Sequence, residues 1–222
     1  MKKKKLSILA IFVVAILSVV SLVACNKGGG DKAKSDNISR MTKSYYAGES
    51  ELFAVSVECG RREKTFIADG KCCDVVDFQE ISITPLTKNN YETISFELVS
   101  TGNTLSGVVS PKGNGEFKAE LTLNFVPTLV NLKVGDKSST VELQNLLAEA
   151  KSIDEIVKIA STEFAERIAK ESVNGVLTRE IYIKLISGDR TNYYFYVSYI
   201  GAGTDYWAML IDPVTGQVIS KR

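Results

Sequence analysis

The chain of 222 residues contains no histidine. Histidine is the commonest metal ligand in proteins and the usual general base near neutral pH. Its absence excludes Ser-His-Asp and Cys-His hydrolysis, and also every zinc site that requires histidine. The patterns Ser-x-x-Lys, Gly-x-Ser-x-Gly and Gly-x-x-x-x-Gly-Lys-Ser/Thr are missing as well. We therefore expect no catalytic residue, no metal site and no cofactor, which argues against an enzyme; a carboxylate-pair enzyme such as a glycosidase survives without positive support.

Cysteine is scarce, and no Cys-x-x-Cys pair is present, so neither a zinc knuckle nor a thioredoxin-type redox site is supported. Three cysteines follow Cys25, namely Cys59, Cys72 and Cys73. Neighbouring cysteines rarely bond each other without strain. Two alternatives stay open: one disulfide from Cys59 to Cys72 or Cys73, or three reduced and partly buried thiols.

The amino terminus has the layout of a secretory signal. Four lysines follow Met1, and residues 6–24 carry no charge. The alternative is an uncleaved transmembrane anchor, because 19 apolar residues are just long enough to span a bilayer. The lysines hold the amino end in the cytoplasm in both cases, so the rest of the chain is expected outside.

The end of this apolar run, Leu22-Val23-Ala24-Cys25, resembles the lipobox of bacterial lipoproteins. In that family the cysteine thiol is alkylated with diacylglycerol, the signal is cut before the cysteine, and the new amino terminus is usually acylated. The resemblance implies a signal peptide over 1–24, lipidation at Cys25, and an anchor on the extracytoplasmic face of the cell membrane. Two or more acyl chains give stable attachment where one chain is marginal.

Removing residues 1–24 leaves 198 residues with 23 basic and 26 acidic side chains, because four of the 27 basic residues leave and no acid does. A net charge of −3 does not suggest nucleic acid or anionic lipid as a partner. Residues 25–38 include three consecutive glycines and mostly polar side chains, so we expect a flexible tether there.

Residues 39–137 alternate apolar and polar side chains with a period of two, which predicts a β-sandwich or a small barrel. Asp69-Gly70 is a strong hairpin signal between two such runs. The expected strands are 52–58, 64–68, 75–78, 81–83, 91–99, 105–109 and 117–125.

Residues 138–222 predict a second, α+β domain, in which one main helix packs on an antiparallel sheet. Capping-box patterns begin at Ser139 and again at Ser152. The second opens an amphipathic helix that ends near Glu171, and strands are expected at 176–186, 191–200, 206–212 and 217–220. In the alternative, the chain is one domain and these late strands join the earlier sheet.

The strand expected over 191–200 carries an unusual aromatic run, and alternate side chains of a strand point to opposite faces. One face would carry Tyr193, Phe195, Val197 and Tyr199, and we expect it to pack on the helix. The other face would carry Tyr194, Tyr196 and Ser198. It is either a half-exposed sheet face or a platform that binds peptide or glycan. The candidate binding residues are Tyr194, Tyr196, Tyr182, Tyr206 and Trp207.

The ending Asp212-Pro213-Val214-Thr215-Gly216-Gln217-Val218, after a helix and antiparallel strands, resembles a PepSY domain. Such domains occur in propeptides of secreted proteases and in envelope proteins, where they are thought to bind and restrain peptidases. The resemblance implies a non-catalytic, lipid-anchored binding or regulatory protein that contacts an envelope protein, peptide or peptidase. The alternative is a solute- or glycan-binding lipoprotein.

Overall fold

A computed structural model describes residues 36–87, 90–112, 116–203 and 205–222. The signal peptide, Cys25 and nearly all of the tether lie outside the described residues, so the lipobox and its lipid remain expectations. The described part is mostly β, with mixed sheets and one short main helix. No helix among the described residues is both long enough and apolar enough to cross a bilayer.

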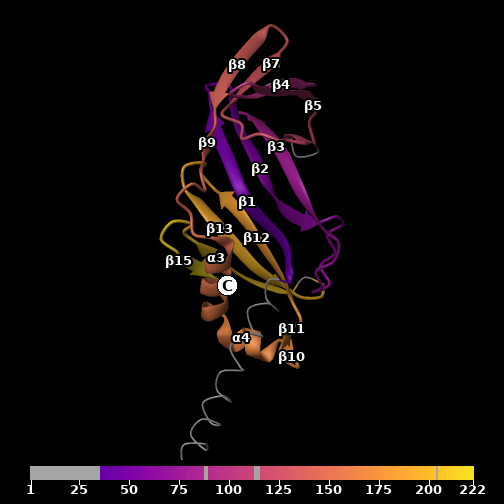
Figure 1. The fold of residues 1–222 in the computed structure, drawn as a ribbon, viewed down its shortest axis with the longest axis vertical. Coiled ribbons are helices and arrows are strands. Elements are labelled where there is room, and N and C mark those ends of the chain that lie inside the picture. Colours follow the sequence, from indigo (N-terminus) through magenta and orange to yellow (C-terminus); the bar gives the residue numbers. More distant parts are fainter. Residues whose placement is uncertain (1–35, 88–89, 113–115, 204) are drawn as a thin grey trace, which may run out of the picture.

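The larger sheet runs through the whole molecule (Figure 1). Its strands lie in the order β15-β14-β13-β12-β1-β2-β3-β6, and β9 also pairs with β1. Its strands are β1 (Ile38–Glu49), β2 (Phe53–Glu63), β3 (Val75–Pro85), β6 (Phe117–Glu120), β9 (Gln144–Asn145), β12 (Glu180–Ser187), β13 (Tyr193–Ile200), β14 (Tyr206–Ile211) and β15 (Val218–Lys221).

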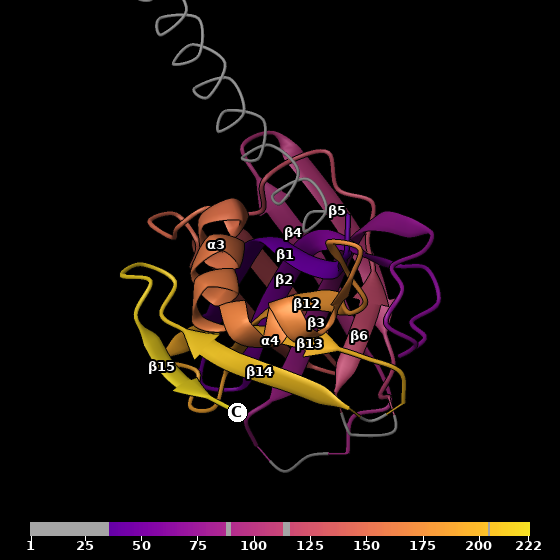
Figure 2. The same ribbon diagram turned by 90° about the horizontal axis from the view of Figure 1, so that it is seen from below.

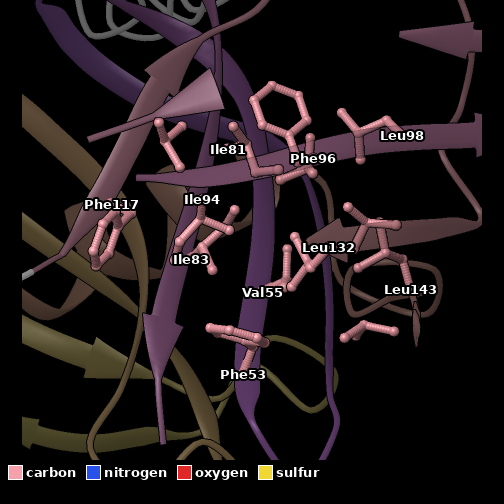
Figure 3. Close-up of a cluster of buried hydrophobic side chains, with 14 residues drawn as sticks. Phe53, Val55, Ile81, Ile83, Ile94, Phe96, Leu98, Phe117, Leu132 and Leu143 are labelled. Atoms are coloured by element: carbon pink, nitrogen blue, oxygen red, sulfur yellow. The ribbon is translucent and has the colours of Figure 1, made fainter. Parts of the chain in front are cut away.

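A smaller sheet lies at the top of Figure 1, in the order β5-β4-β7-β8. Its strands are β4 (Ile94–Ser100), β5 (Asn103–Val109), β7 (Leu129–Val134) and β8 (Lys137–Glu142). It packs on β2, β3 and β6 through a core that Figure 3 shows, in which Val55 and Ile81 of the larger sheet meet Phe96 and Leu132 of the smaller one. The two sheets do not close into a barrel, so the barrel alternative is wrong for the part of the chain that is described.

The main helix, α3 (Ile153–Glu163), begins at Ser152, where the capping box is confirmed. The Ser152 hydroxyl accepts from the amide of Glu155, and the Glu155 carboxylate accepts from the Ser152 amide at 2.9 Å. The expected single helix is interrupted at Phe164 and continues as α4 (Ala165–Lys170). A two-stranded ribbon of β10 (Ser172–Val173) and β11 (Val176–Leu177) follows it.

The apolar stripe of the helices forms a second core with β12, β13 and β14, and Figure 2 shows α3 and α4 lying over these strands. Ile156 and Ala160 of α3 are fully buried against Ile183 and Val197 of the strands. The predicted packing of the helix on an antiparallel sheet is therefore confirmed for β12–β14.

Strand β1 joins the two parts of the molecule. It pairs antiparallel with β2 and parallel with β12, so the late strands continue the early sheet. Tyr46 of β1 packs against the core between the sheets, while Met41 and Tyr45 pack against the core under the helix. Thr42 strengthens the junction: its hydroxyl accepts from the Leu185 amide and donates to the Glu58 carboxylate at 2.7 Å.

Several local predictions were wrong. The strand expected over 117–125 ends at Glu120, and the strands expected at 75–78 and 81–83 are the single strand β3. Residues 64–68 are not a strand; they open an irregular loop, 64–74, in which Gly70 takes a φ of +79° between the antiparallel strands β2 and β3. Residues 139–142 have the capping-box pattern but lie in β8, because Val141 is buried in the core between the sheets. Tertiary packing overrides a local helix-start pattern when alternate side chains can be buried.

Candidate functional site

The strands β12–β14 have two faces with different chemistry. On the face toward the helices, Phe195, Val197 and Tyr199 are buried, as the alternation predicted. The opposite face carries Tyr182 on β12, Tyr196 on β13 and Tyr206 on β14. These three tyrosines line a hollow of about 610 Å³. We call this hollow the tyrosine pocket.

Trp207 does not belong to this pocket, contrary to our expectation that it extends the tyrosine face. It is 4% exposed, and its ring stacks on Tyr199 with centroids 4.1 Å apart and an interplanar angle of 6°. Phe164 meets both rings edge-on. The reason is strand alternation: Trp207 follows Tyr206 directly, so the two side chains point to opposite faces.

Tyr194 shares the strand face of Tyr196 but does not line the pocket. It pairs with Ile186, one step farther from the end of the sheet that the pocket occupies. The structure therefore brings together three of the five predicted residues and leaves Tyr194 and Trp207 outside.

The loop 64–74 forms one wall of the tyrosine pocket. Its Phe66 ring meets the Tyr182 ring edge-on, with centroids 6.1 Å apart. The loop is held by the connection between β13 and β14. The Gly203 amide donates to the Ala68 carbonyl at 3.0 Å, and Asp69 forms a β-bridge with Ala202. The pocket therefore lies between two segments that are far apart in the sequence.

Two arginines line the pocket beside Phe78. The guanidinium carbons of Arg40 and Arg62 each lie 4.6 Å from the centre of the Phe78 ring, within the range of a cation–π contact. Both arginines already have acidic partners. Arg40 donates to Glu58 at 2.8 Å. Arg62 pairs with Glu80 at 3.7 Å and with Glu120.

Two glutamates at this end of the sheet are buried. Glu63 lines the pocket and is 6% exposed; one carboxylate oxygen accepts from the Cys73 amide at 2.7 Å, and the other has no partner. Glu180 is fully buried, and neither of its carboxylate oxygens has a partner among the described residues.

Burial raises the pKa of Glu180, and the nearby carboxylates of Glu63 and Asp69 raise it further. The Ser39 hydroxyl and the Gly70 amide lower the pKa in part. The Ser39 hydroxyl itself donates to the Ile181 carbonyl oxygen at 3.5 Å. The Cys72 thiol lies in the same region, and burial and Glu63 raise its pKa to about 11.

No local pattern in the sequence indicates these buried carboxylates. Glu63 stands in the charged stretch Arg61–Lys64, and such stretches are usually solvated. Glu180 fits the polar side of an alternating strand. The loop 64–74 reaches both, since the Cys73 amide donates to Glu63 and Gly70 lies beside Glu180.

No group of three or more acidic or cysteine side chains that could hold a metal ion occurs within the described residues. Cys59, Cys72 and Cys73 are free thiols; Cys59 and Cys72 are partly buried, as the second alternative had it, whereas Cys73 is exposed. Two further hollows, of about 950 and 780 Å³, are larger than the tyrosine pocket. In the part of the chain that is described, neither is lined by an unpartnered buried polar atom.

No family model matches the chain, and neither a curated protein nor a solved structure is significantly similar to it. The site must therefore be interpreted from its own chemistry. A half-open hollow with several aromatic walls and a few polar groups is typical of a ligand-binding site.

Proposed function

We propose that this chain is a lipid-anchored, extracytoplasmic binding protein without catalytic activity, and that the tyrosine pocket holds its ligand. The single observation that carries this proposal is the convergence of Tyr182, Tyr196 and Tyr206 with the Phe66 loop around one hollow. Tyrosines combine an apolar ring with a polar tip, which suits recognition surfaces that are partly wet.

The pocket supports a ligand that is small or is one end of a larger molecule. A volume of about 610 Å³ falls within the usual range of small-ligand sites. An extended segment or terminal group of an envelope protein or peptide fits this size. A free solute or a short glycan, our second candidate, fits it equally, and the ring-rich walls favour it.

We further propose that residues 39–137 act as a β-sandwich module and residues 138–222 as a PepSY-like module. The support for the first is the core shared by the two sheets, and for the second the helix over β12–β14 and the turn at Asp212–Gly216. The relation to PepSY domains, and with it a peptidase partner, rests on the sequence pattern alone.

The test compares two tyrosines on one strand face. We expect Tyr196→Ala to abolish binding of ligands found in a fragment and peptide screen by ligand-observed NMR. Tyr194→Ala is the matched control, because this residue shares the face and lies outside the pocket. Equal loss in both variants, or no loss in either, would place the binding elsewhere and refute the proposal.

A further inference from the structure

Unpartnered acceptors gather beside the tyrosine pocket, on Glu63, which lines it, and on the neighbouring Glu180. Five buried side-chain nitrogen or oxygen atoms lack a hydrogen-bond partner among the described residues. Three of them are carboxylate oxygens of Glu63 and Glu180, and the other two are the Nε donors of Arg40 and Arg179. A buried carboxylate without a partner is costly, so natural proteins keep one mainly where something else satisfies it.

The charges around the pocket are not balanced. The cations Arg40 and Arg62 are neutralised by their own partners Glu58, Glu80 and Glu120. Lys64 also lines the pocket, but it is exposed, so water screens its charge. Glu63 and Glu180 have no cationic partner, and their burial limits screening. The uncompensated charge at the buried end of the pocket is therefore negative.

The aromatic walls suit the same kind of ligand. Faces of tyrosine and phenylalanine attract cations, and this attraction grows when water is excluded. Phe66, Tyr182 and Tyr196 line the same pocket as Glu63. An ammonium group also brings N–H donors, which the free carboxylate oxygens lack.

From this geometry we infer that the tyrosine pocket binds a primary ammonium group attached to a ring-bearing body, with Glu63 as the direct acceptor and Glu180 as the charge behind it. This inference rests on the proposed function, since it uses the same pocket. A primary ammonium group is common to a peptide amino terminus, a free aromatic amine and an amino sugar, so each of these could be the ligand.

The experiment uses the soluble chain from residue 36 onward and four probes of similar size. Phenethylamine carries the ring and the primary ammonium; its N,N,N-trimethyl derivative keeps the charge without N–H donors; 2-phenylethanol is neutral; 3-phenylpropanoate is negative. We expect phenethylamine to bind most tightly and 3-phenylpropanoate most weakly, by ligand-observed NMR and calorimetry.

The variants locate the recognition. Glu63→Gln keeps the shape and removes the charge, and should weaken phenethylamine by about tenfold or more while leaving 2-phenylethanol nearly unchanged. Glu180→Gln should weaken the amine by a smaller factor. Glu149→Gln is the control, because Glu149 is exposed and does not line the pocket. Melting curves verify folding, and Glu180→Gln remains available if Glu63→Gln does not fold.

A second measurement detects whether Glu180 releases its proton when the ligand binds. Burial holds the pKa of Glu180 high in the free pocket, and a bound ammonium would lower it. Binding at mildly acidic pH should then release protons, which calorimetry in buffers of different ionisation enthalpy detects. Glu180→Gln should abolish that release.

Three results would overturn the inference. Tightest binding of 3-phenylpropanoate, lost in Tyr196→Ala, would mean that Arg40 and Arg62 do the recognition; the proposed function would stand and the ammonium would not. If the trimethyl derivative bound as tightly as phenethylamine, the carboxylate oxygens would not be accepting N–H hydrogen bonds from the ligand. A lack of phenethylamine binding would also refute the inference. The proposed function would still be tested by comparing Tyr196→Ala with Tyr194→Ala. If phenethylamine binds, free against acetylated phenylalanine peptides and glucosamine against N-acetylglucosamine identify the source of the amine.

Discussion

The two faces of β12–β14 are built from neighbouring residues and behave in opposite ways. On the inner face, Phe195 and Tyr199 pack with Trp207 under the helices, and each is at most 4% exposed. On the outer face, Tyr196 and Tyr206 are half-buried or exposed and line a hollow. Both faces are aromatic, so aromatic content does not distinguish a core from a binding surface.

The distinguishing feature is what covers each face. The amphipathic helix α3 and the Phe164 junction that follows it fill the space over the inner face with Ile156, Ala160 and Phe164. Over the outer face lies the irregular loop 64–74, which borders the hollow and the unpartnered carboxylate oxygen of Glu63. A loop whose shape depends on a few hydrogen bonds cannot pack as densely as a helix with an apolar stripe.

The largest expected effect comes from removing β1, the strand that pairs with β12 and joins it to the rest of the larger sheet. The isolated segment 138–222 keeps the helix and strands but loses β1 and with it Met41 and Tyr45 from the core. A separate domain over 138–222 would unfold cooperatively on its own, whereas the junction at β1 leads us to expect a poorly ordered fragment. A sharp thermal transition with native-like near-UV circular dichroism would support the two-domain prediction instead.

The next effect tests the inner face against the outer face directly. Phe195→Ala should lower the free energy of unfolding by about 3–5 kcal/mol, because it removes a fully buried ring. Tyr196→Ala should lower it by about 1 kcal/mol or less, because that ring is partly exposed. Denaturant titration measures both. Similar losses would mean that the outer face is also core and that the hollow is filled.

A smaller effect concerns pH and Glu180, whose pKa is raised in the folded chain. Above the ordinary glutamate pKa the unfolded chain has lost this proton while the folded chain retains it, so stability falls as pH rises toward the raised value. We expect Glu180→Gln to flatten this decline and to stabilise the protein at neutral pH. Glu149→Gln should leave the profile unchanged, and an unaltered slope in Glu180→Gln would contradict the assignment.

The smallest expected effect is on thiol chemistry beside the pocket. Cys73 is exposed, whereas the pKa of Cys72 is raised to about 11. At pH 8 the Cys72 thiolate fraction is then about a hundredfold below that of an ordinary thiol, since the thiolate is the reactive form. Iodoacetamide should modify Cys73 first, as peptide mass mapping can verify. Faster modification of Cys72 would show that the loop leaves the carboxylates open to water.

Much of the fold could be predicted from local pattern. Period-two alternation located most strands, and the Ser152 capping box with its apolar stripe located the helix. The strands at 38–49, 129–134 and 137–142 were missed, the last because a helix-start pattern at Ser139 obscured an alternating strand. For the candidate site, alternation correctly paired Tyr182 with Tyr196, and the inclusion of Trp207 was an error against the same rule.

The sequence by itself determined which side chains share a strand face and where the helix begins, because both depend on spacing within a few residues. It also excluded chemistry that depends on histidine, because the chain contains none. Only the tertiary structure decided that β1 lies between β2 and β12, and that the loop 64–74 closes over Glu63 and Glu180. The contacts of β1 with β12 and of the loop with Glu180 join residues more than a hundred positions apart. No local pattern encodes which distant segment will exclude water from a charge.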